Sequence, residues 1–230
     1  MCHREIKENA IFIADSHYPH HGKELFNILK AIDKREIITE QLFLIGDNFD
    51  LLFGYNQYIK SFSQDAITIL DKLSYKIEIY YFEGNHDFLL SDIFKNIHIY
   101  TREEQPISFN YKNRIVSISH GDKYDTNILY TLYSKILRNR YFIKLLKPFE
   151  KNIINHQIDK LKTKKICHKF KNFEKKVDKI LENYSNSDIV IEGHFHQEKI
   201  IKNYYSLPSL ACQKKIGIIK NSKIEFILFR

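Results

Sequence analysis

The segment QLFLIGDNFD (residues 41–50) joins a short apolar run to a polar turn that carries two carboxylates. The run Gln41–Ile45 predicts a buried strand because it is short, mostly apolar and followed by the turn pair Gly46-Asp47. Asp47 and Asp50 therefore stand just beyond the carboxyl end of a strand. Open sheets bind ligands in the crevice beyond their strands' carboxyl ends, so this segment predicts both a sheet and a site.

Four further apolar runs are followed by polar clusters of the same kind. Ala10–Ala14 precedes DSH (residues 15–17), Lys76–Phe82 precedes GNHD (84–87), Arg114–Ser119 precedes HGD (120–122), and Asp188–Ile191 precedes GHFH (193–196). A turn or a core histidine would explain any one of these clusters equally well. Five in order, each after a predicted strand, instead predict one convergent site.

The clusters contain five of the 11 histidines, together with carboxylate or amide oxygens. Mixed imidazole and oxygen donors suit manganese, iron, zinc or nickel better than a thiolate or an all-oxygen calcium site would. The sequence thus predicts a transition-metal centre.

The rest of the chain alternates strand and helix patterns. Further strands are predicted at Lys199–Tyr205, Lys215–Ile219 and Lys223–Phe229, and helices at Gly22–Asp33 and Gln57–Leu73. This alternation predicts an α/β (α+β) fold. No Gly/Ser/Pro-rich linker divides the chain, so residues 1–230 are predicted to form one domain.

From Lys123 to Ser187 helical periodicity replaces the strand pattern, which predicts a helical insertion between two strands of the main fold. An apolar stripe runs among its basic residues: Ile128, Leu129, Leu132, Tyr133, Ile136, Leu137, Phe142, Leu145, Leu146 and Phe149. Two interpretations stay open. The stripe packs only on the main domain, or it forms a lipid-binding cap that resembles a basic interfacial helix.

Composition excludes several classes of protein. With 43% hydrophobic and 28% charged residues, the chain is neither disordered nor fibrous. No apolar run of about 18 residues predicts a membrane span, and the charged start MCHREIKENA argues against a signal peptide. Cys2, Cys167 and Cys212 are expected to be free thiols, so we expect a cytoplasmic protein.

The net charge of +8 favours anionic partners, although a merely solvated basic surface is an equal alternative. Nucleic acid is the less favoured partner, because the basic residues lie in an apolar-striped segment without a stacking platform for bases. A scaffold protein without chemistry is also disfavoured, since every cluster carries metal-ligating residue types.

The blocks DSH, GDNFD, GNHD, HGD and GHFH resemble the five signature blocks of the calcineurin-like metallophosphoesterases, over residues 15–196. The resemblance implies a four-layer αββα sandwich of two mixed sheets and two divalent metal ions, with manganese expected and iron, zinc or nickel as alternatives. It implies that one metal is bound by Asp15, His17 and His196, and the other by Asn85, His120 and His194. Asp47 would bridge the two.

Two cations about 3.5–4 Å apart clamp a phosphoryl group and lower the pKa of a shared water, which gives a phosphoester hydrolase. The resemblance implies that His86 donates to the phosphate or leaving oxygen without binding metal. Asp50 would hold the His86 ring in the correct tautomer, with a helix N-cap as its other interpretation. His20 and His21 follow the DSH block and are candidates for the rim of the site.

A helical insertion between the HGD and GHxH blocks resembles the UDP-2,3-diacylglucosamine hydrolases of lipid A biosynthesis. Those enzymes cleave a pyrophosphate to give UMP and 2,3-diacylglucosamine 1-phosphate. Phe88-Leu89-Leu90 also resembles their GNRDFLL block, and Asn85, Asn127 and Tyr130 are the implied substrate-binding residues. The resemblance implies peripheral contact with the cytoplasmic face of the inner membrane.

Two positions depart from that subfamily, which usually has Arg in place of His86 and Glu in place of Asp50. The chain also has no Trp, although the subfamily pattern expects one shortly after the second block. A general cytosolic phosphodiesterase or phosphatase for nucleotides or other soluble phosphoesters therefore stays the alternative.

Overall fold

Strand β2 (Gln41–Ile45) lies in the interior of a six-stranded mixed sheet, and all five of its residues are buried. It pairs in parallel with β1 (Ile11–Ile13) on one side and β4 (Glu78–Phe82) on the other. The order β13-β12-β1-β2-β4-β6 is completed by β6 (His98–Tyr100), β12 (Lys215–Lys220) and β13 (Lys223–Leu228). The computed structural model describes residues 4–124 and 134–229.

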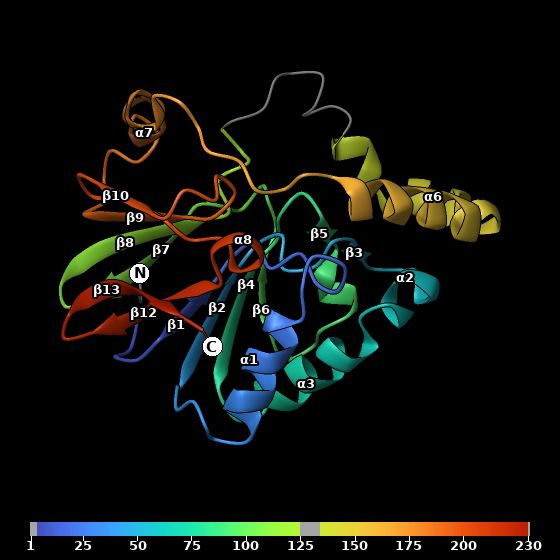
Figure 1. Cartoon of the computed structure of the whole chain (residues 1–230), viewed down its shortest axis with the longest axis horizontal. Helices are drawn as coiled ribbons and strands as arrows, with labels where there is room; N and C mark the ends of the chain where they lie inside the picture. Colours follow the sequence, from blue (N-terminus) through green and yellow to red (C-terminus); the bar gives the residue numbers. More distant parts are fainter. Residues whose placement is uncertain (1–3, 125–133, 230) are drawn as a thin grey trace.

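A second, five-stranded sheet faces the first (Figure 1). Its order is β10-β11-β9-β8-β7, with β7 at Ile107–Tyr111, β8 at Arg114–Ser119, β9 at Ile189–Glu192, β10 at Lys199–Ile201 and β11 at Tyr204–Ser206. Strands β8 and β9 are parallel, so the HGD and GHFH blocks leave this sheet at the same edge. Two short strands, β3 (Leu52–Phe53) and β5 (Asp87–Phe88), pair beside that edge.

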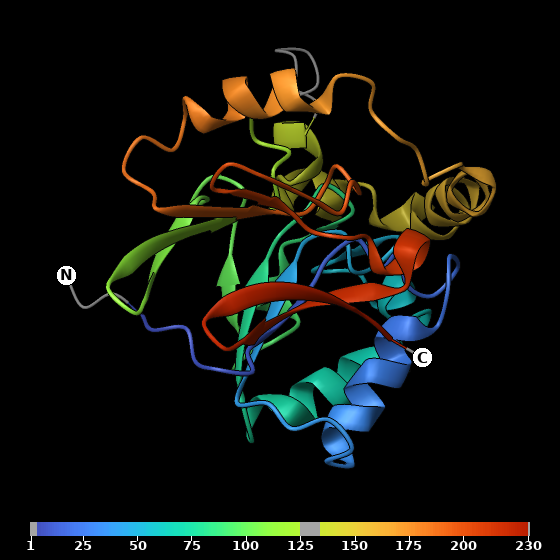
Figure 2. The same cartoon turned by 60° about the vertical axis from the view of Figure 1, so that its left-hand side comes forward.

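The apolar side chains pack in three interfaces between the layers of the fold. Phe12 and Phe43 of the first sheet pack with Phe109 and Ile118 of the second. Helices α1 (Glu24–Asp33) and α3 (Gln64–Ser74) cover the outer face of the first sheet. Helix α7 (Phe173–Leu181) packs on the outer face of the second (Figure 2). These layers confirm the predicted αββα sandwich.

The remaining helices lie around the edge where the polar clusters gather. They are α2 (Gln57–Ser61), α5 (Arg140–Leu145), α6 (Glu150–Thr163) and α8 (Leu210–Gln213), with 3₁₀ turns at Leu90–Asp92 and Lys147–Phe149. Ile154 and Ile158 of α6 pack with Ile59 of α2, which places α6 beside the main domain (Figure 1). Among the described residues, no helix has both the length and the apolar character to cross a membrane.

Most predicted elements are confirmed within a few residues, but two are wrong as single elements. The strand predicted at Lys199–Tyr205 is the hairpin β10–β11, because the chain turns at Lys202 with φ at +55°. The helix predicted at Gln57–Leu73 is interrupted at Phe62–Ser63, where the amides bond three residues back as in a tightened last turn. Strands β6 and β7 were not predicted.

The expectation of free thiols is wrong for two of the three cysteines. Cys167 and Cys212 form a disulfide, with Cα atoms 5.6 Å apart although 45 positions separate them in the chain. The fold creates this proximity, and nothing in the local sequence signals it. Cys2 lies outside the described residues.

Candidate metal centre and adjoining pocket

The five polar clusters converge at one edge of the sandwich. Asp15, Asp47 and Asn85 follow β1, β2 and β4 of the six-stranded sheet, and His120, His194 and His196 follow β8 and β9 of the other. Hydrogen bonds join the first two clusters directly, since the Asp15 amide donates to the Gly46 carbonyl at 3.1 Å and the His17 amide donates to the Asp47 carbonyl at 3.1 Å. Both sheets therefore contribute side chains to one centre.

Backbone conformation turns these side chains into the site. Asp15, His17, Asp47, His194 and His196 have positive φ values between 46° and 57°. Residues other than glycine rarely adopt this left-handed region, which costs about 1–3 kcal/mol each and concentrates at functional sites. The strain bends the chain sharply as each strand ends, so that consecutive polar residues face the same centre.

The first cluster, called here the Asp15 site, consists of Asp15, His17 and His196. Their ligating atoms lie within 4.8 Å of one another, and all three residues are buried. Both carboxylate oxygens of Asp15 lack a hydrogen-bond partner among the described residues. A buried, unsatisfied carboxylate is costly, and a cation would remove that cost.

The second cluster, called here the Asp47 site, consists of Asp47, His120 and His194, again within 4.8 Å. His120 Nε2 lies 3.6 Å from Asp47 Oδ2 and 3.4 Å from Asn85 Oδ1. On its other side, His120 Nδ1 donates to the Ile45 carbonyl at 3.0 Å. This bond fixes the tautomer that presents Nε2 to the centre, as outer contacts of metal-binding histidines do.

The electrostatics suit a cation site. Burial opposes ionisation of Asp47, but His120 and His86 more than offset this and hold its pKa well below the usual range. Burial lowers the pKa of His17 to about 4, so its ring is neutral near pH 7 and can offer a lone pair. Imidazole nitrogens with carboxylate and amide oxygens form a donor set that fits a divalent transition metal.

Asp87 organises the loops without facing the centre, a role that the sequence did not reveal. Its carboxylate accepts hydrogen bonds from the amides of Asp47 (3.0 Å), Asn48 (2.7 Å) and Gly84 (2.8 Å), and from the Tyr81 hydroxyl (2.6 Å). It thereby ties the GDNFD loop to the GNHD loop. A Cβ at Gly84 would lie 2.3 Å from Asp47 Oδ1, so the close approach of these loops requires glycine there.

His86 lies next to both clusters, and its ring packs edge-on to His17 at 5.3 Å between centroids. The expected contact with Asp50 exists, but through the backbone. His86 Nδ1 donates to the Asp50 carbonyl at 2.7 Å, which leaves Nε2 free to face a substrate. The Asp50 carboxylate instead accepts from Nδ1 of His20 (3.0 Å) and Nδ1 of His21 (2.6 Å).

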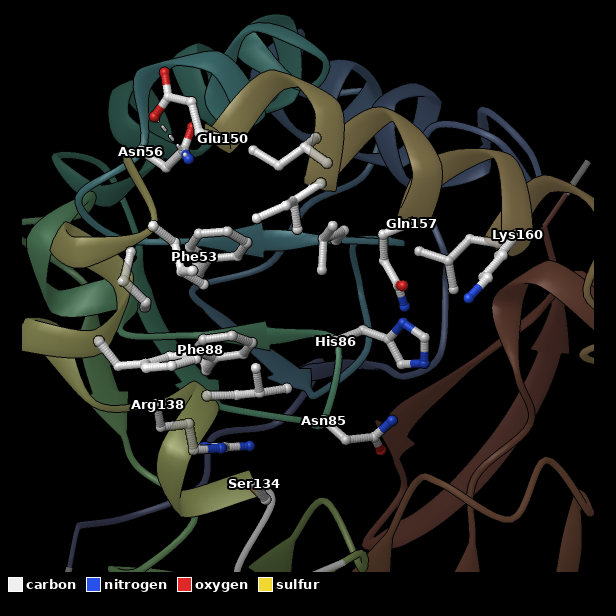
Figure 3. Close-up of a pocket in the computed structure, with 18 of the residues that line it drawn as sticks. Phe53, Asn56, Asn85, His86, Phe88, Ser134, Arg138, Glu150, Gln157 and Lys160 are labelled. Atoms are coloured by element: carbon white, nitrogen blue, oxygen red, sulfur yellow. Dashed lines mark hydrogen bonds between the residues drawn. The ribbon is translucent and has the colours of Figure 1, made fainter. Parts of the chain in front are cut away.

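A pocket of about 540 Å³ opens beside Asn85 and His86 (Figure 3). Phe53 and Phe88 line one side of it. Apolar side chains from the segment 134–164 line the rest, namely Leu137, Phe142, Ile143, Leu146, Ile153, Ile154 and Leu161. Gln157 and Lys160 of α6 extend toward His86, so the end of the pocket nearest the metal clusters is polar (Figure 3).

Arg138 links the pocket wall to the GNHD loop, a role that was not predicted. It donates to the Gly84 carbonyl, its Nη1 lies 3.3 Å from Glu83 Oε2, and its guanidinium stands over the Phe88 ring. The predicted substrate-binding residues Asn127 and Tyr130 lie outside the described residues, as do Ile128, Leu129, Leu132 and Tyr133 of the stripe.

Comparison with known proteins identifies a matching family and several similar chains. The family model described as calcineurin-like phosphoesterase matches residues 9–198. A UDP-2,3-diacylglucosamine hydrolase from Blochmanniella pennsylvanica is 29% identical, covering 96% of this chain and 95% of that protein. A UDP-2,3-diacylglucosamine hydrolase from Wigglesworthia glossinidia brevipalpis is 25% identical, covering 94% and 95%. Among solved structures, a dimetal phosphatase from Danio rerio is 10% identical with a TM-score of 0.48, covering 95% of each chain.

Proposed function

The chain belongs to the calcineurin-like phosphoesterase family and is a metal-dependent phosphoester hydrolase; on this premise we propose that it cleaves the pyrophosphate of UDP-2,3-diacylglucosamine. The products are UMP and 2,3-diacylglucosamine 1-phosphate, an intermediate of lipid A biosynthesis. Similarity to several curated proteins named UDP-2,3-diacylglucosamine hydrolase along most of their length supports this substrate.

The main structural support for this substrate is the apolar pocket beside the candidate metal clusters. A diacylated sugar joined to a nucleotide diphosphate needs a deep apolar chamber for its chains and polar groups for its head. The pocket offers both, with aromatic and aliphatic walls and with Asn85, His86 and Lys160 at one end. Each buried methylene contributes about 0.8 kcal/mol, so such a chamber favours acylated substrates strongly over soluble ones.

We propose that Asp15, His17 and His196 hold one divalent ion, that Asn85, His120 and His194 hold the other, and that Asp47 bridges them. Manganese suits this donor set, with iron, zinc or nickel as alternatives. When bound, such a pair supplies Lewis-acid polarisation of the phosphoryl group and activation of water. His86, held by the Asp50 carbonyl, directs Nε2 toward the phosphate. In its protonated form, with a proton on each ring nitrogen, it donates from Nε2 to the developing charge or the leaving oxygen.

We further propose that residues 123–187 act as a cap on a single domain spanning residues 1–230. Residues of this segment between 134 and 164 form most of the pocket wall, while α7 completes the outer layer of the sandwich. The cap thus selects the substrate, and the two sheets supply the chemistry.

The two neighbouring leucines at the end of α5 provide a matched test. Leu146 lines the pocket, whereas Leu145 is 73% exposed. With the diacyl substrate dispersed in detergent and Mn²⁺ present, Leu146→Asp should raise KM by about tenfold or more, because a leucine side chain that becomes buried against an acyl chain contributes about 1.5–3 kcal/mol. Leu145→Asp should leave KM unchanged, and both variants should hydrolyse bis-p-nitrophenyl phosphate at the wild-type rate.

The result also decides between the two candidate substrates. Loss of both activities in Leu146→Asp would show that the apolar wall is only core packing. Failure of the wild-type enzyme to cleave the diacyl substrate, with efficient cleavage of a soluble nucleotide or diester, would replace this proposal with the general phosphodiesterase.

We also propose that the cap contacts anionic lipid at the cytoplasmic face of a membrane. Five large apolar side chains of residues 136–153 are exposed, namely Ile136, Tyr141, Leu145, Phe149 and Ile153, and we call them the cap face. Arg140, Lys144, Lys147 and Lys151 lie among them in the sequence, and all four are exposed. Apolar and basic side chains together are typical of surfaces that bind anionic membranes.

A further inference from the structure

A short segment without helix or strand lies beside His196 of the Asp15 site. It consists of residues 164–168, called here the strap, which continue from the end of α6. The Ile166 carbonyl accepts a hydrogen bond from His196 Nδ1 at 3.1 Å. His168 packs beside the His196 ring, with 5.8 Å between centroids. The strap therefore provides the outer contact that orients His196, whose Nε2 lies 3.1 Å from Asp15 Oδ1.

The Cys167–Cys212 disulfide ties the middle of this strap to α8. Helix α8 is itself anchored at the metal centre, since the Ser209 hydroxyl donates to the Asp15 carbonyl at 2.8 Å and the Gln213 amide donates to the His196 carbonyl at 2.7 Å. Cys212 Sγ lies 3.9 Å from His196 Nδ1. The disulfide thus fixes the strap to the same element that holds Asp15 and His196.

Within the part of the chain that the structure describes, few other contacts would hold the strap if the disulfide were broken. The Lys164 carbonyl lies 3.3 Å from His21 Nε2, and the His168 carbonyl accepts from the Gln197 amide at 3.2 Å. Of the strap's five residues only Ile166 is buried, and Cys167 itself is exposed. A segment with so few buried contacts opens locally at low free energy, and the exposed sulfur is accessible to a thiol.

We propose that the Cys167–Cys212 disulfide is a redox-controlled positioning device for His196. In the oxidised protein the strap holds the His196 ring toward the Asp15 site. A dithiol donates two electrons and two protons, which breaks the S–S bond, forms two cysteine thiols and leaves the reductant as a disulfide. The freed strap no longer fixes the Ile166 carbonyl, and metal binding at the Asp15 site weakens.

The test measures metal affinity separately from activity. Isothermal titration calorimetry with Mn²⁺ is carried out in a His194→Ala background, in which the Asp15 site is intact. Three samples are compared: the oxidised protein, the protein reduced with dithiothreitol that is then removed anaerobically, and the Cys167→Ser/Cys212→Ser variant. We expect reduction and the double substitution each to weaken binding about tenfold, the lower end of the range for lost outer contacts. Oxidation of the reduced protein by a small-molecule disulfide should restore the affinity. The Cys2→Ser substitution in the same background should leave the Mn²⁺ affinity equal to that of the His194→Ala protein.

Hydrogen exchange on the metal-free protein gives a second readout, in which reduction should speed exchange at residues 164–168. Equal Mn²⁺ affinity in the oxidised and reduced protein would overturn the proposal. It would also be overturned if peptide mapping found both cysteines as thiols after exposure to the disulfide oxidant. In a His17→Ala background, which leaves the Asp47 site, an equal loss of affinity on reduction would indicate general loosening and not positioning. None of these outcomes depends on the identity of the phosphoester substrate.

Discussion

The contact between His86 and Asp50 runs through the main chain, which separates the contributions of the two side chains. The Asp50 carbonyl, present in every variant, orients His86, while the carboxylate orients His20 and His21. His86→Asn should therefore lower kcat by about a hundredfold or more, as for loss of a proton-transfer group, with both metals retained. Asp50→Asn should lower kcat much less. Steady-state kinetics with metal analysis checks both.

The order of these two effects is the critical comparison. An Asp50→Asn variant as impaired as His86→Asn would mean that the carboxylate, and not the carbonyl, controls the catalytic ring. Loss of half the metal from His86→Asn would make His86 a ligand. His156→Ala, an exposed histidine on α6, is the matched control for general effects of histidine removal.

Glu83 makes stability depend on pH near neutrality. Burial raises its pKa to about 7, although the Leu90 amide and Arg138 favour the ionised form. Between pH 5 and 7 the unfolded chain loses this proton while the folded chain keeps it, so stability falls as pH rises through that range. Glu83→Gln should abolish this contribution, a relative gain on the order of 3 kcal/mol above pH 7.

Urea unfolding of metal-free wild type and Glu83→Gln at pH 5 and pH 8 measures this difference. Glu182→Gln, at an exposed position, is the control. A constant difference between wild type and Glu83→Gln across that range would show that Glu83 is ionised throughout, paired with Arg138.

At the scale of elements, the cap face and the pocket wall come from the same helices and share Ile153, but their other side chains make different contacts. Tyr141 and Leu145 are 82% and 73% exposed, while Leu146 lines the pocket. In sedimentation with phosphatidylglycerol vesicles at low salt, Tyr141→Asp and Leu145→Asp should each weaken binding about tenfold. Leu146→Asp should bind like wild type. Equal binding of wild type to neutral phosphatidylcholine vesicles would refute the electrostatic part of the proposal.

Elements defined by local patterns were predictable, and elements defined by distant contacts were not. The strand Gln41–Ile45 was predicted because apolar residues run without interruption into a turn, and the convergence of the polar clusters because each directly follows such a strand. The interruption at Phe62–Ser63 breaks no apolar periodicity, so the sequence could not show it. Likewise Arg138 meets Gly84 across 54 positions, and Cys167 meets Cys212 across 45. Such pairs depend on how the cap folds back.

At the scale of the whole molecule, the candidate metal centre lies between the two sheets and depends on both. Asp15, Asp47 and Asn85 come from the ends of one sheet's strands, and His120, His194 and His196 from those of the other. Cations held by these residues as proposed would therefore link the two sheets at one edge and relieve the unsatisfied carboxylate of Asp15. Metal binding should stabilise the entire sandwich and not only the loops that carry the ligands.

This linkage predicts a large and selective thermal shift. At Mn²⁺ concentrations about 1,000-fold above Kd, binding adds about 4 kcal/mol, which corresponds to roughly 10 °C in Tm for a chain of this size. EDTA should reverse the shift, and His156→Ala should show it in full. Asp47→Asn should show less than half of it, since the proposed bridge serves both ions. Calorimetry should find one cooperative transition with and without metal, because the interleaved aromatic layer of Phe12, Phe43 and Phe109 couples the sheets independently of the ions. Two separate transitions on metal removal would mean instead that the metals, and not this layer, hold the sheets together.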